Sequence, residues 1–212
     1  MTLIYDIETG PLPDDEILRV MGEFDPDSVK IGNRGPDKAE EYIEEKRASY
    51  LDDLRDKAAL SPLTGEVLCI GLWSKGPGAY VWPSDSDEFC LLLDFWHAVS
   101  KDTVTLGFNN RRFDLPFLIK RSWLFRIELD DLTTVIGSQI DLLQRWQCGD
   151  NQASVNLDTM ARFLLGHGKL DDFDAKYFYK YWAEEREKAI EYVRRDVEIT
   201  AKCAEVLGEI NP

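Results

Sequence analysis

Two acidic side chains stand one residue apart near the amino terminus, in the stretch MTLIYDIETG. The alternation of residues 2–8 predicts a β-strand, and side chains two apart on a strand share a face, so Asp6 and Glu8 lie side by side. Like charges at that spacing repel, so the pair persists at low cost only if a cation lies between the carboxylates or both face water. The pair alone leaves both interpretations open.

Two later stretches carry side chains suited to the same chemistry. GFNNRRFDLPFL places Asp114 where a strand gives way to a helix, with Pro116 in the first helical turn. EYVRRDVEIT places Tyr192 and Asp196 four residues apart, on one stripe of a helix. Taken singly, Asp114 is explained as a first-turn carboxylate favoured by the helix dipole, and the Tyr–Asp spacing is common by chance.

Together these blocks form an ordered pattern: D-x-E ending the first strand, N-x-x-x-F-D after a later strand, and Y-x-x-x-D on a C-terminal helix. The pattern resembles the DEDDy branch of the DnaQ-like 3′–5′ exonucleases, which have the ribonuclease H-like fold and include the editing domain of family-B DNA polymerases. The blocks span residues 6–196. The stretch from residue 32 to residue 71 is also similar to predicted stand-alone exonucleases related to that editing domain.

The resemblance implies a catalytic role for the matching residues. It makes Asp6, Glu8, Asp114 and Asp196 the ligands of two Mg²⁺ or Mn²⁺ ions, which as hard cations prefer oxygen donors. It makes Tyr192 the residue that positions the attacking water, and whether the phenol acts as a base or only orients the water stays open.

The substrate of such an enzyme is a DNA 3′ end or single-stranded DNA, and RNA is not excluded by the residues. Single strands are held by aromatic stacking and cationic contacts, which makes the loop before Asp114 the first candidate surface. That loop comprises residues 108–113, and the predicted substrate contacts in it are Asn109, Asn110, Arg111 and Phe113. For Arg111 and Arg112 an ordinary solvated turn stays open as the alternative. By resemblance, Thr9 and Leu12 also touch the terminal nucleotide. A second wall is considered at Lys169, Lys176 and Lys180, among Tyr177, Tyr179 and Tyr181.

One competing assignment uses a histidine. The sister DEDDh branch carries a His five residues before its last Asp, and His167 precedes Asp172 by that interval. Gly166 and Gly168 flank His167 and predict a loop rather than the required helix.

Three other polar side chains are given structural roles. His97 lies in an apolar helix and is expected to be packed. Asp158 is expected to cap a helix, and Asp141 to face the cleft.

The order of elements predicts an α/β fold, a ribonuclease H-like mixed sheet flanked by helices. Strands are expected at 2–8, 65–74, 79–83 and 103–108, and 138–146 is interpreted as a strand running into a turn. Helices are expected at 85–99, 111–125, 156–166 and 184–210. Residues 14–60 form an acidic, partly helical insertion with an amphipathic helix at 36–60, inside a single domain of residues 1–212.

Composition and net charge bear on the partners and location of the protein. The 212 residues are 44% hydrophobic and carry a net charge of −15, of which 14 acidic against 8 basic side chains lie in residues 14–57. The acidity argues against tight non-specific binding to nucleic acid, although bound cations would reverse the field at the site. With no long apolar run and no secretory leader, a cytoplasmic protein without membrane contact is expected. Cys69, Cys90, Cys148 and Cys203 are interpreted as buried thiols.

The prediction is therefore a metal-dependent 3′–5′ exonuclease that hydrolyses terminal phosphodiesters by a two-metal-ion mechanism. Two alternatives stay open: a structure-selective endonuclease of the same fold, and a nucleic-acid-binding module without turnover. The insertion at residues 14–60 is expected to cover a surface, with a protein partner there as the unsupported alternative.

Overall fold

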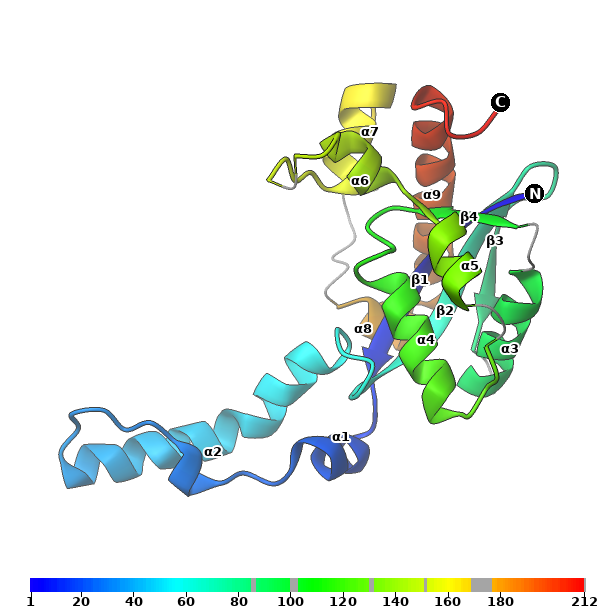
Figure 1. Ribbon diagram of the computed structural model, residues 1–212. Coiled ribbons are helices and arrows are strands. Elements are labelled where there is room, and N and C mark those ends of the chain that lie inside the picture. The colour runs from blue at the N-terminus through cyan, green and yellow to red at the C-terminus, as the bar shows by residue number, and fades with distance from the viewer. Residues whose placement is uncertain (85–86, 100–102, 130–131, 151, 169–176, 212) are drawn as a thin grey trace. The chain divides into compact units, whose positions relative to one another are not determined.

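The computed structural model describes residues 1–84, 87–99, 103–129, 132–150, 152–168 and 177–211 (Figure 1). The chain divides into two compact units. One unit comprises Met1–Thr9 and Val67–Pro212, and the other comprises Gly10–Glu66. The predicted α/β architecture is confirmed, with a mixed sheet and flanking helices.

Five strands form the sheet, in the order β3-β2-β1-β4-β5. Their bounds are β1 Thr2–Pro11, β2 Gly65–Ser74, β3 Gly78–Pro83, β4 Val104–Gly107 and β5 Ile140–Asp141. β1 and β4 are parallel, as are β4 and β5, whereas β2 and β3 form an antiparallel hairpin. The carboxyl ends of β1, β4 and β5 therefore meet at one edge of the sheet.

Helices cover both faces of this sheet (Figure 1). The bounds in this unit are α3 Glu88–Ala98, α4 Asp114–Leu124, α5 Leu132–Ser138, α6 Leu142–Gln147, α7 Leu157–Leu165, α8 Phe178–Glu184 and α9 Arg186–Val206. Alternate residues of β1 enter different cores: Leu3, Tyr5 and Ile7 pack with side chains of α3 and α4, whereas Ile4 packs with side chains of α7 and α9. The sheet is thus buried on both faces, with α3 and α4 on one and α9 on the other.

Two close approaches set the positions of the helices around β1. A Cβ atom on Gly71 of β2 would meet Val193 Cγ1 of α9 at 2.6 Å, so only glycine lets α9 lie this near the sheet. A Cβ atom on Gly107 would meet the side chain of Asn110 at 2.5 Å and the carbonyl oxygen of Tyr5 at 2.8 Å. The second glycine lets the chain turn tightly from β4 toward α4.

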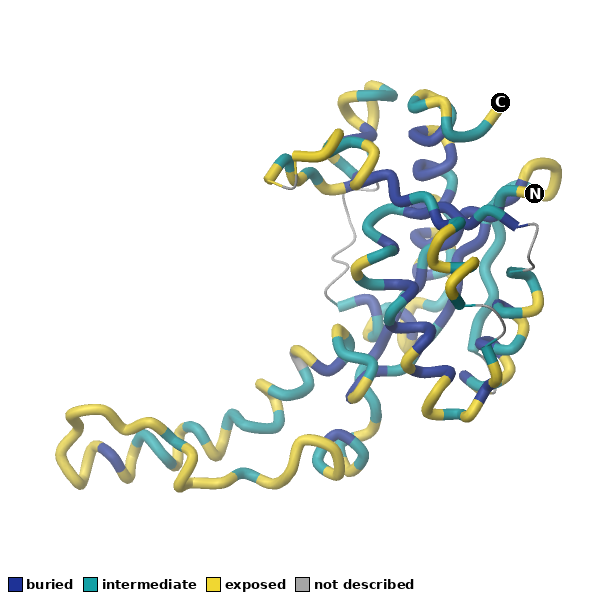
Figure 2. The backbone as a smooth tube through the Cα atoms, in the orientation of Figure 1, coloured by how far each residue is buried: buried dark blue, intermediate teal, exposed yellow. Residues whose placement is uncertain are grey.

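The unit Gly10–Glu66 is built on α1 Asp14–Met21, a 3₁₀ turn at Pro26–Ser28 and α2 Pro36–Ala58. Arg55 of α2 forms an ion pair with Asp14 of α1, and the Tyr50 hydroxyl donates to the Gly22 carbonyl oxygen at 3.0 Å. Most of its residues are exposed or only partly buried (Figure 2). The helix predicted at 36–60 is present as α2, and α1 is a further helix in the acidic stretch before it.

Several other expectations need correction. The stretch 138–146 is mainly helical, because β5 has two residues and α6 begins at Leu142. Asn156, rather than Asp158, caps α7 by accepting a hydrogen bond from the Thr159 amide at 2.7 Å. His97 is exposed in the last turn of α3 instead of packed.

The cysteines also differ from the expectation. Cys69 and Cys203 are buried, but Cys90 and Cys148 are exposed. Cys90 lies on α3, and Cys148 directly follows α6.

Candidate active site

The two acidic residues of β1 lie on the strand face that α9 covers. They follow Ile4 at the alternating spacing that keeps side chains on one face, and both are partly buried. Ile4 itself is fully buried in the core formed with α7 and α9. The same face therefore changes from apolar to acidic as β1 approaches its carboxyl end.

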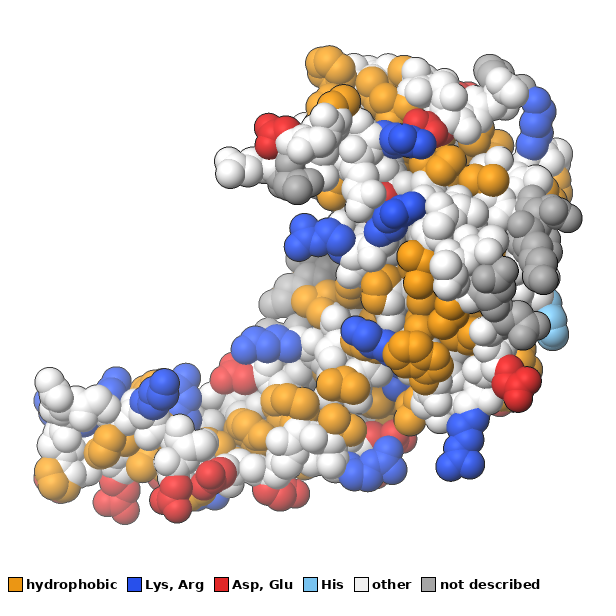
Figure 3. Space-filling view, in the orientation of Figure 1, with side chains coloured by type: hydrophobic (Ala, Val, Ile, Leu, Met, Phe, Trp, Pro, Cys, Tyr) orange, Lys and Arg blue, Asp and Glu red, His pale blue; other side chains and the backbone are white. Residues whose placement is uncertain are grey.

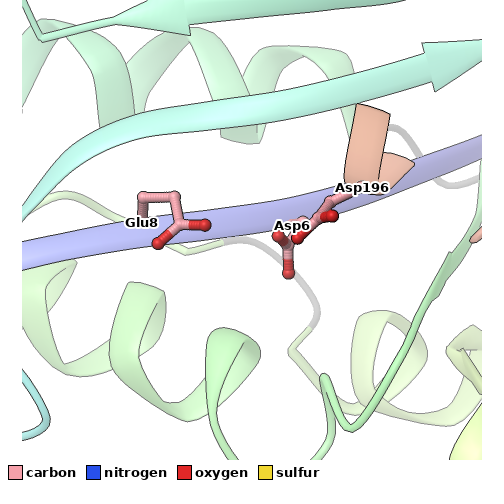
Figure 4. A group of neighbouring side chains, drawn as sticks. All are labelled: Asp6, Glu8 and Asp196. Atoms are coloured by element: carbon pink, nitrogen blue, oxygen red, sulfur yellow. The ribbon is translucent and has the colours of Figure 1, made fainter. Parts of the chain in front are cut away.

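Helix α9 brings a third carboxylate to this position. Asp6, Glu8 and Asp196 each offer an oxygen, and these oxygens all lie within 4.8 Å of one another. Figure 4 shows Asp6 and Glu8 on β1 and Asp196 on α9. The close packing of α9 at Gly71 explains this convergence, because Asp196 lies between Val193 and Val197, the two side chains nearest that glycine.

Asp114 approaches β1 from the first turn of α4, the helix that follows the neighbouring strand β4. β4 ends at Gly107, whose neighbour Leu106 pairs with Ile4, so the β1 backbone beyond that point runs past the end of β4. Asp114 Oδ1 accepts a hydrogen bond from the Ile7 amide at 2.9 Å. The side chain also hydrogen-bonds with Asp6, and burial raises the pKa of Asp114 to about 7. Asp114 thus adjoins the three converging carboxylates without being one of them.

The phenol of Tyr192 completes the group on α9. Its hydroxyl hydrogen-bonds with Asp196, one helical turn away, and the ring packs against Phe178 of α8 with centroids 6.3 Å apart. Burial, followed by the charges of Asp196, Glu8 and Asp6, raises the pKa of Tyr192 above its usual range. The hydroxyl is therefore held beside the carboxylates by both packing and hydrogen bonding.

The predicted substrate-contact residues are distributed unevenly. Thr9 is 9% exposed at the end of the acidic strand, whereas Leu12 belongs to the unit Gly10–Glu66 and hydrogen-bonds through its amide with the Thr64 carbonyl oxygen at 2.9 Å. Asn110 is fully buried and turned toward β5. Asn109 and Phe113 are partly buried.

Arg111, between Asn109 and Phe113 in the sequence, donates a hydrogen bond from Nε to the Gln139 carbonyl oxygen at 3.2 Å.

The structure describes only some of the residues of the competing assignment and of the second wall. His167 is exposed after Gly166, which ends α7 in a left-handed conformation, and Asp172 lies outside the described residues. Lys169 and Lys176 also lie outside them. Lys180 is over the Tyr177 ring at 4.7 Å, so this part of the proposed second wall is a basic and aromatic pair.

Asp141 is buried, and its carboxylate accepts hydrogen bonds from the backbone amides of Asn109, Arg111 and Leu143. It holds the loop that precedes Asp114, and it also lines two small hollows beside that loop. The sequence analysis missed Gln139, which donates from Nε2 to the Tyr5 hydroxyl at 2.6 Å beneath the acidic strand. A polar residue directly before the apolar start of β5 was the available signal.

The acidic group fits a divalent cation. Its donors are carboxylate oxygens from two separate elements, which is the donor type that Mg²⁺ and Mn²⁺ prefer. Bringing three like charges within 4.8 Å is electrostatically costly unless positive charge is supplied among them. A cation at this position would remove that cost.

Comparison with known proteins identifies the family. A model of the RNase_H superfamily matches residues 57–207, so the chain belongs to this superfamily. The matched region includes Asp114, Tyr192 and Asp196 and begins after Asp6 and Glu8.

Similar sequences come from archaea. A DNA polymerase of Archaeoglobus fulgidus is 29% identical to this chain over 126 residues. The aligned region is 52% of this chain and 16% of the polymerase. An uncharacterized protein of Methanocaldococcus jannaschii is 26% identical to this chain over 164 residues. The aligned region is 72% of this chain and 91% of that protein.

A solved structure supports the same fold. The family B DNA polymerase of Pyrobaculum calidifontis superimposes with a TM-score of 0.63 at 17% identity, over 97% of this chain and 24% of the polymerase. The chain thus corresponds to a small part of each polymerase. Superfamily membership confirms the expected ribonuclease H-like fold, and these similarities confirm the expected resemblance to DNA polymerases. Among the described residues, no helix is long and apolar enough to cross a membrane.

Proposed function

We propose that the chain is a metal-dependent 3′–5′ exonuclease that hydrolyses terminal phosphodiesters of DNA, with RNA as a second polymer to be tested. The observation that carries the proposal is the convergence of Asp6, Glu8 and Asp196 within 4.8 Å, with the Tyr192 hydroxyl on Asp196. The RNase H fold supports a nucleic-acid substrate.

The four acidic residues would hold the cations. Asp6, Glu8 and Asp196 offer converging oxygens, and Asp114 adjoins them through its hydrogen bond with Asp6. Two Mg²⁺ or Mn²⁺ ions bound there would supply Lewis-acid stabilisation of the phosphate and a water of lowered pKa. The contribution of β1, α4 and α9 is to hold carboxylates from distant parts of the sequence at one position.

Tyr192 is proposed to orient the water that attacks the terminal phosphorus. Its hydroxyl is held beside Asp196, and its ring is fixed by Phe178, so the hydrogen-bonding group has a defined direction. A fixed donor and acceptor near the reacting oxygen favours the geometry of attack without itself carrying charge. Asn109, Arg111 and Phe113, with Thr9, are proposed to hold the last nucleotides of the strand.

A labelled single strand tests this proposal and separates it from its alternatives. Purified protein is incubated with Mn²⁺ and an oligonucleotide labelled at the 3′ end or, in a second reaction, at the 5′ end. A 3′–5′ exonuclease releases labelled mononucleotide from the first substrate and shortens the second one nucleotide at a time. Internal fragments from both would instead identify an endonuclease, and binding without cleavage would identify a non-catalytic module.

The polymer is tested in the same assay. DNA and RNA strands of identical sequence are compared at equal concentration, with chelator added to a parallel reaction as the control. We expect cleavage of DNA that stops when the cations are removed. Cleavage that continues in chelator would contradict the metal assignment.

A further inference from the structure

Two small hollows adjoin the loop that leads into α4. One has a volume of about 370 Å³ and the other of about 240 Å³, and they share Asp141 and Gln144 as wall residues. Both lie where β4 and β5 end and α6 begins. The side chains that give them their polar character are Asn109, Arg111, Arg112, Gln144, Arg145 and Gln147.

The lining is basic in a protein that is otherwise strongly acidic. The chain has 40 acidic and 25 basic residues, yet the walls of the two hollows contain three arginines and a single acidic residue, Asp141. Figure 3 shows several Lys and Arg side chains on this face, over α4 and α6. A local excess of guanidinium and amide groups is the composition that binds phosphodiester oxygens.

The one acidic wall residue is a buried carboxylate whose oxygens already have hydrogen-bond donors. Asp141 is 3% exposed, and its two oxygens accept hydrogen bonds from the Asn109 and Leu143 amides at 2.9 Å and from the Arg111 amide at 3.3 Å. Its oxygens are therefore occupied by backbone donors. The result is a shaped loop whose side chains line the hollows.

The arginines differ in how firmly they are held. Arg111 donates to the Gln139 carbonyl oxygen, and Arg145 pairs with Glu209 at 2.9 Å. Arg112 is exposed at the wall of the smaller hollow. Each guanidinium has five N–H donors in a fork, so Arg111 and Arg145 keep donors beyond those contacts.

The hollows begin within a short reach of the acidic group. Asn109 precedes Asp114 by five residues, and five residues span at most about 18 Å even when fully extended. Asp114 is itself hydrogen-bonded to Ile7 between the two acidic residues of β1. A strand whose terminal phosphate is at the carboxylates can therefore reach the hollows within a few nucleotides.

We propose that these hollows form a subsite for the sugar–phosphate backbone of the substrate strand, a few nucleotides before its 3′ end. The inference rests on the proposed function for the identity of the strand, and it extends the binding surface to α6. Arg112, Arg145 and Gln144 are its defining side chains. The ligand is the phosphodiester of a polynucleotide, rather than a free mononucleotide.

The test measures binding separately from cleavage. Affinity for a 5′-fluorescein-labelled dT16 strand is measured by anisotropy in chelator, where turnover is prevented, at several salt concentrations. The variants are R112Q and R145Q, with K120Q as the matched control, because Lys120 is an exposed cation of α4 outside both hollow walls.

We expect R112Q and R145Q each to raise Kd about 3- to 10-fold, and to reduce the slope of log K against log salt by about 0.7, the value for one phosphate contact on a single strand. K120Q should leave both quantities unchanged. Equal effects in all three variants, or in none, would overturn the inference.

Hydrolysis then distinguishes this inference from the proposed function. With Mn²⁺, R112Q should raise KM for dT16 while leaving kcat, and KM for the dinucleotide pTpT, close to wild type. An equal loss on the dinucleotide, or stronger product inhibition by dTMP that depends on Arg112, would place the contact at the terminal nucleotide and overturn the subsite. Arginine-dependent binding without cleavage by wild type would instead support the subsite and refute the exonuclease.

Discussion

A single carboxylate, Asp141, and a group of three, Asp6, Glu8 and Asp196, lie near the carboxyl edge of the parallel strands in different surroundings. Asp141 is surrounded by three backbone amide donors within 3.3 Å. Asp6, Glu8 and Asp196 instead bring their oxygens within 4.8 Å of one another. The difference teaches that burial alone does not identify a candidate metal ligand, because a carboxylate satisfied by amides stabilises a loop, whereas converging carboxylates offer several oxygens to one cation.

Asp114 combines features of Asp141 and of the converging group. One oxygen accepts the Ile7 amide, as in a structural carboxylate, and the side chain also hydrogen-bonds with Asp6 of the converging group. This arrangement ties the first residue of α4 to the acidic strand. Substitutions can test whether the converging carboxylates serve catalysis and Asp141 serves stability.

The largest effect is expected for Asp6→Ala. Loss of a central carboxylate should lower kcat by at least about 10³-fold, because cation binding and the charge stabilisation that it provides are removed. The fold should persist, since the substitution relieves repulsion among the converging carboxylates. Release of 3′-label and the circular-dichroism melting curve measure these two outcomes. Full activity in this variant would refute the metal assignment.

Cation binding should be visible without any substrate. Mn²⁺ at about 100 times its Kd should stabilise the folded protein by about 2.7 kcal/mol, which is read as a rise in Tm. Asp196→Asn should largely abolish this rise, whereas Asp141→Asn should retain it. A Tm rise of equal size in both variants would mean that the converging group is not the cation site.

Tyr192→Phe should have an intermediate effect. Removing the hydroxyl is expected to lower kcat roughly 10- to 100-fold, while the Mn²⁺-induced rise in Tm stays close to wild type, since the phenol is not counted among the metal ligands. Steady-state hydrolysis and thermal melting in Mn²⁺ measure the two quantities. A wild-type rate would direct attention to His167.

Asp141→Asn should affect stability more than chemistry. An asparagine presents an N–H group toward backbone amides that need acceptors, which should cost about 1–3 kcal/mol of unfolding free energy. Urea denaturation measures this loss. The matched control is Asp158→Asn, which removes a partly exposed ion pair with Arg162 and should change stability by less than about 1 kcal/mol. Equal losses in the two variants would contradict the structural role of Asp141.

Much of the architecture was predictable because local sequence patterns indicated individual strands, helices and turns. Alternation marked β1, helical spacing marked α2 and α9, and the glycine and proline residues between β2 and β3 marked their turn. The prediction of a strand at 138–146 was wrong because a two-residue strand is too short to show a periodicity. Its short length became clear only from its pairing with Leu106 and Gly107 of β4.

The candidate site was predictable in part, for a similar reason. The residue types and their order suggested the four acids and Tyr192. Nothing in the sequence showed that Asn110 would be fully buried, that Asp141 would bind three amides, or that Arg145 would lie beside Arg111 at one hollow. These facts depend on which way a tight loop turns, and a loop's direction is decided by its tertiary partners.

The sequence by itself determined the chemistry available to this protein: carboxylates at a strand end, an acid before a helix, and a phenol and an acid one turn apart on another helix. Tertiary structure alone decided which of them meet. Gly71 admits α9 close to the sheet, and β4 stops short beside β1, so Asp196 and Asp114 reach Asp6 across 190 and 108 residues of chain. Packing between distant segments sets such distances, and local spacing cannot encode them.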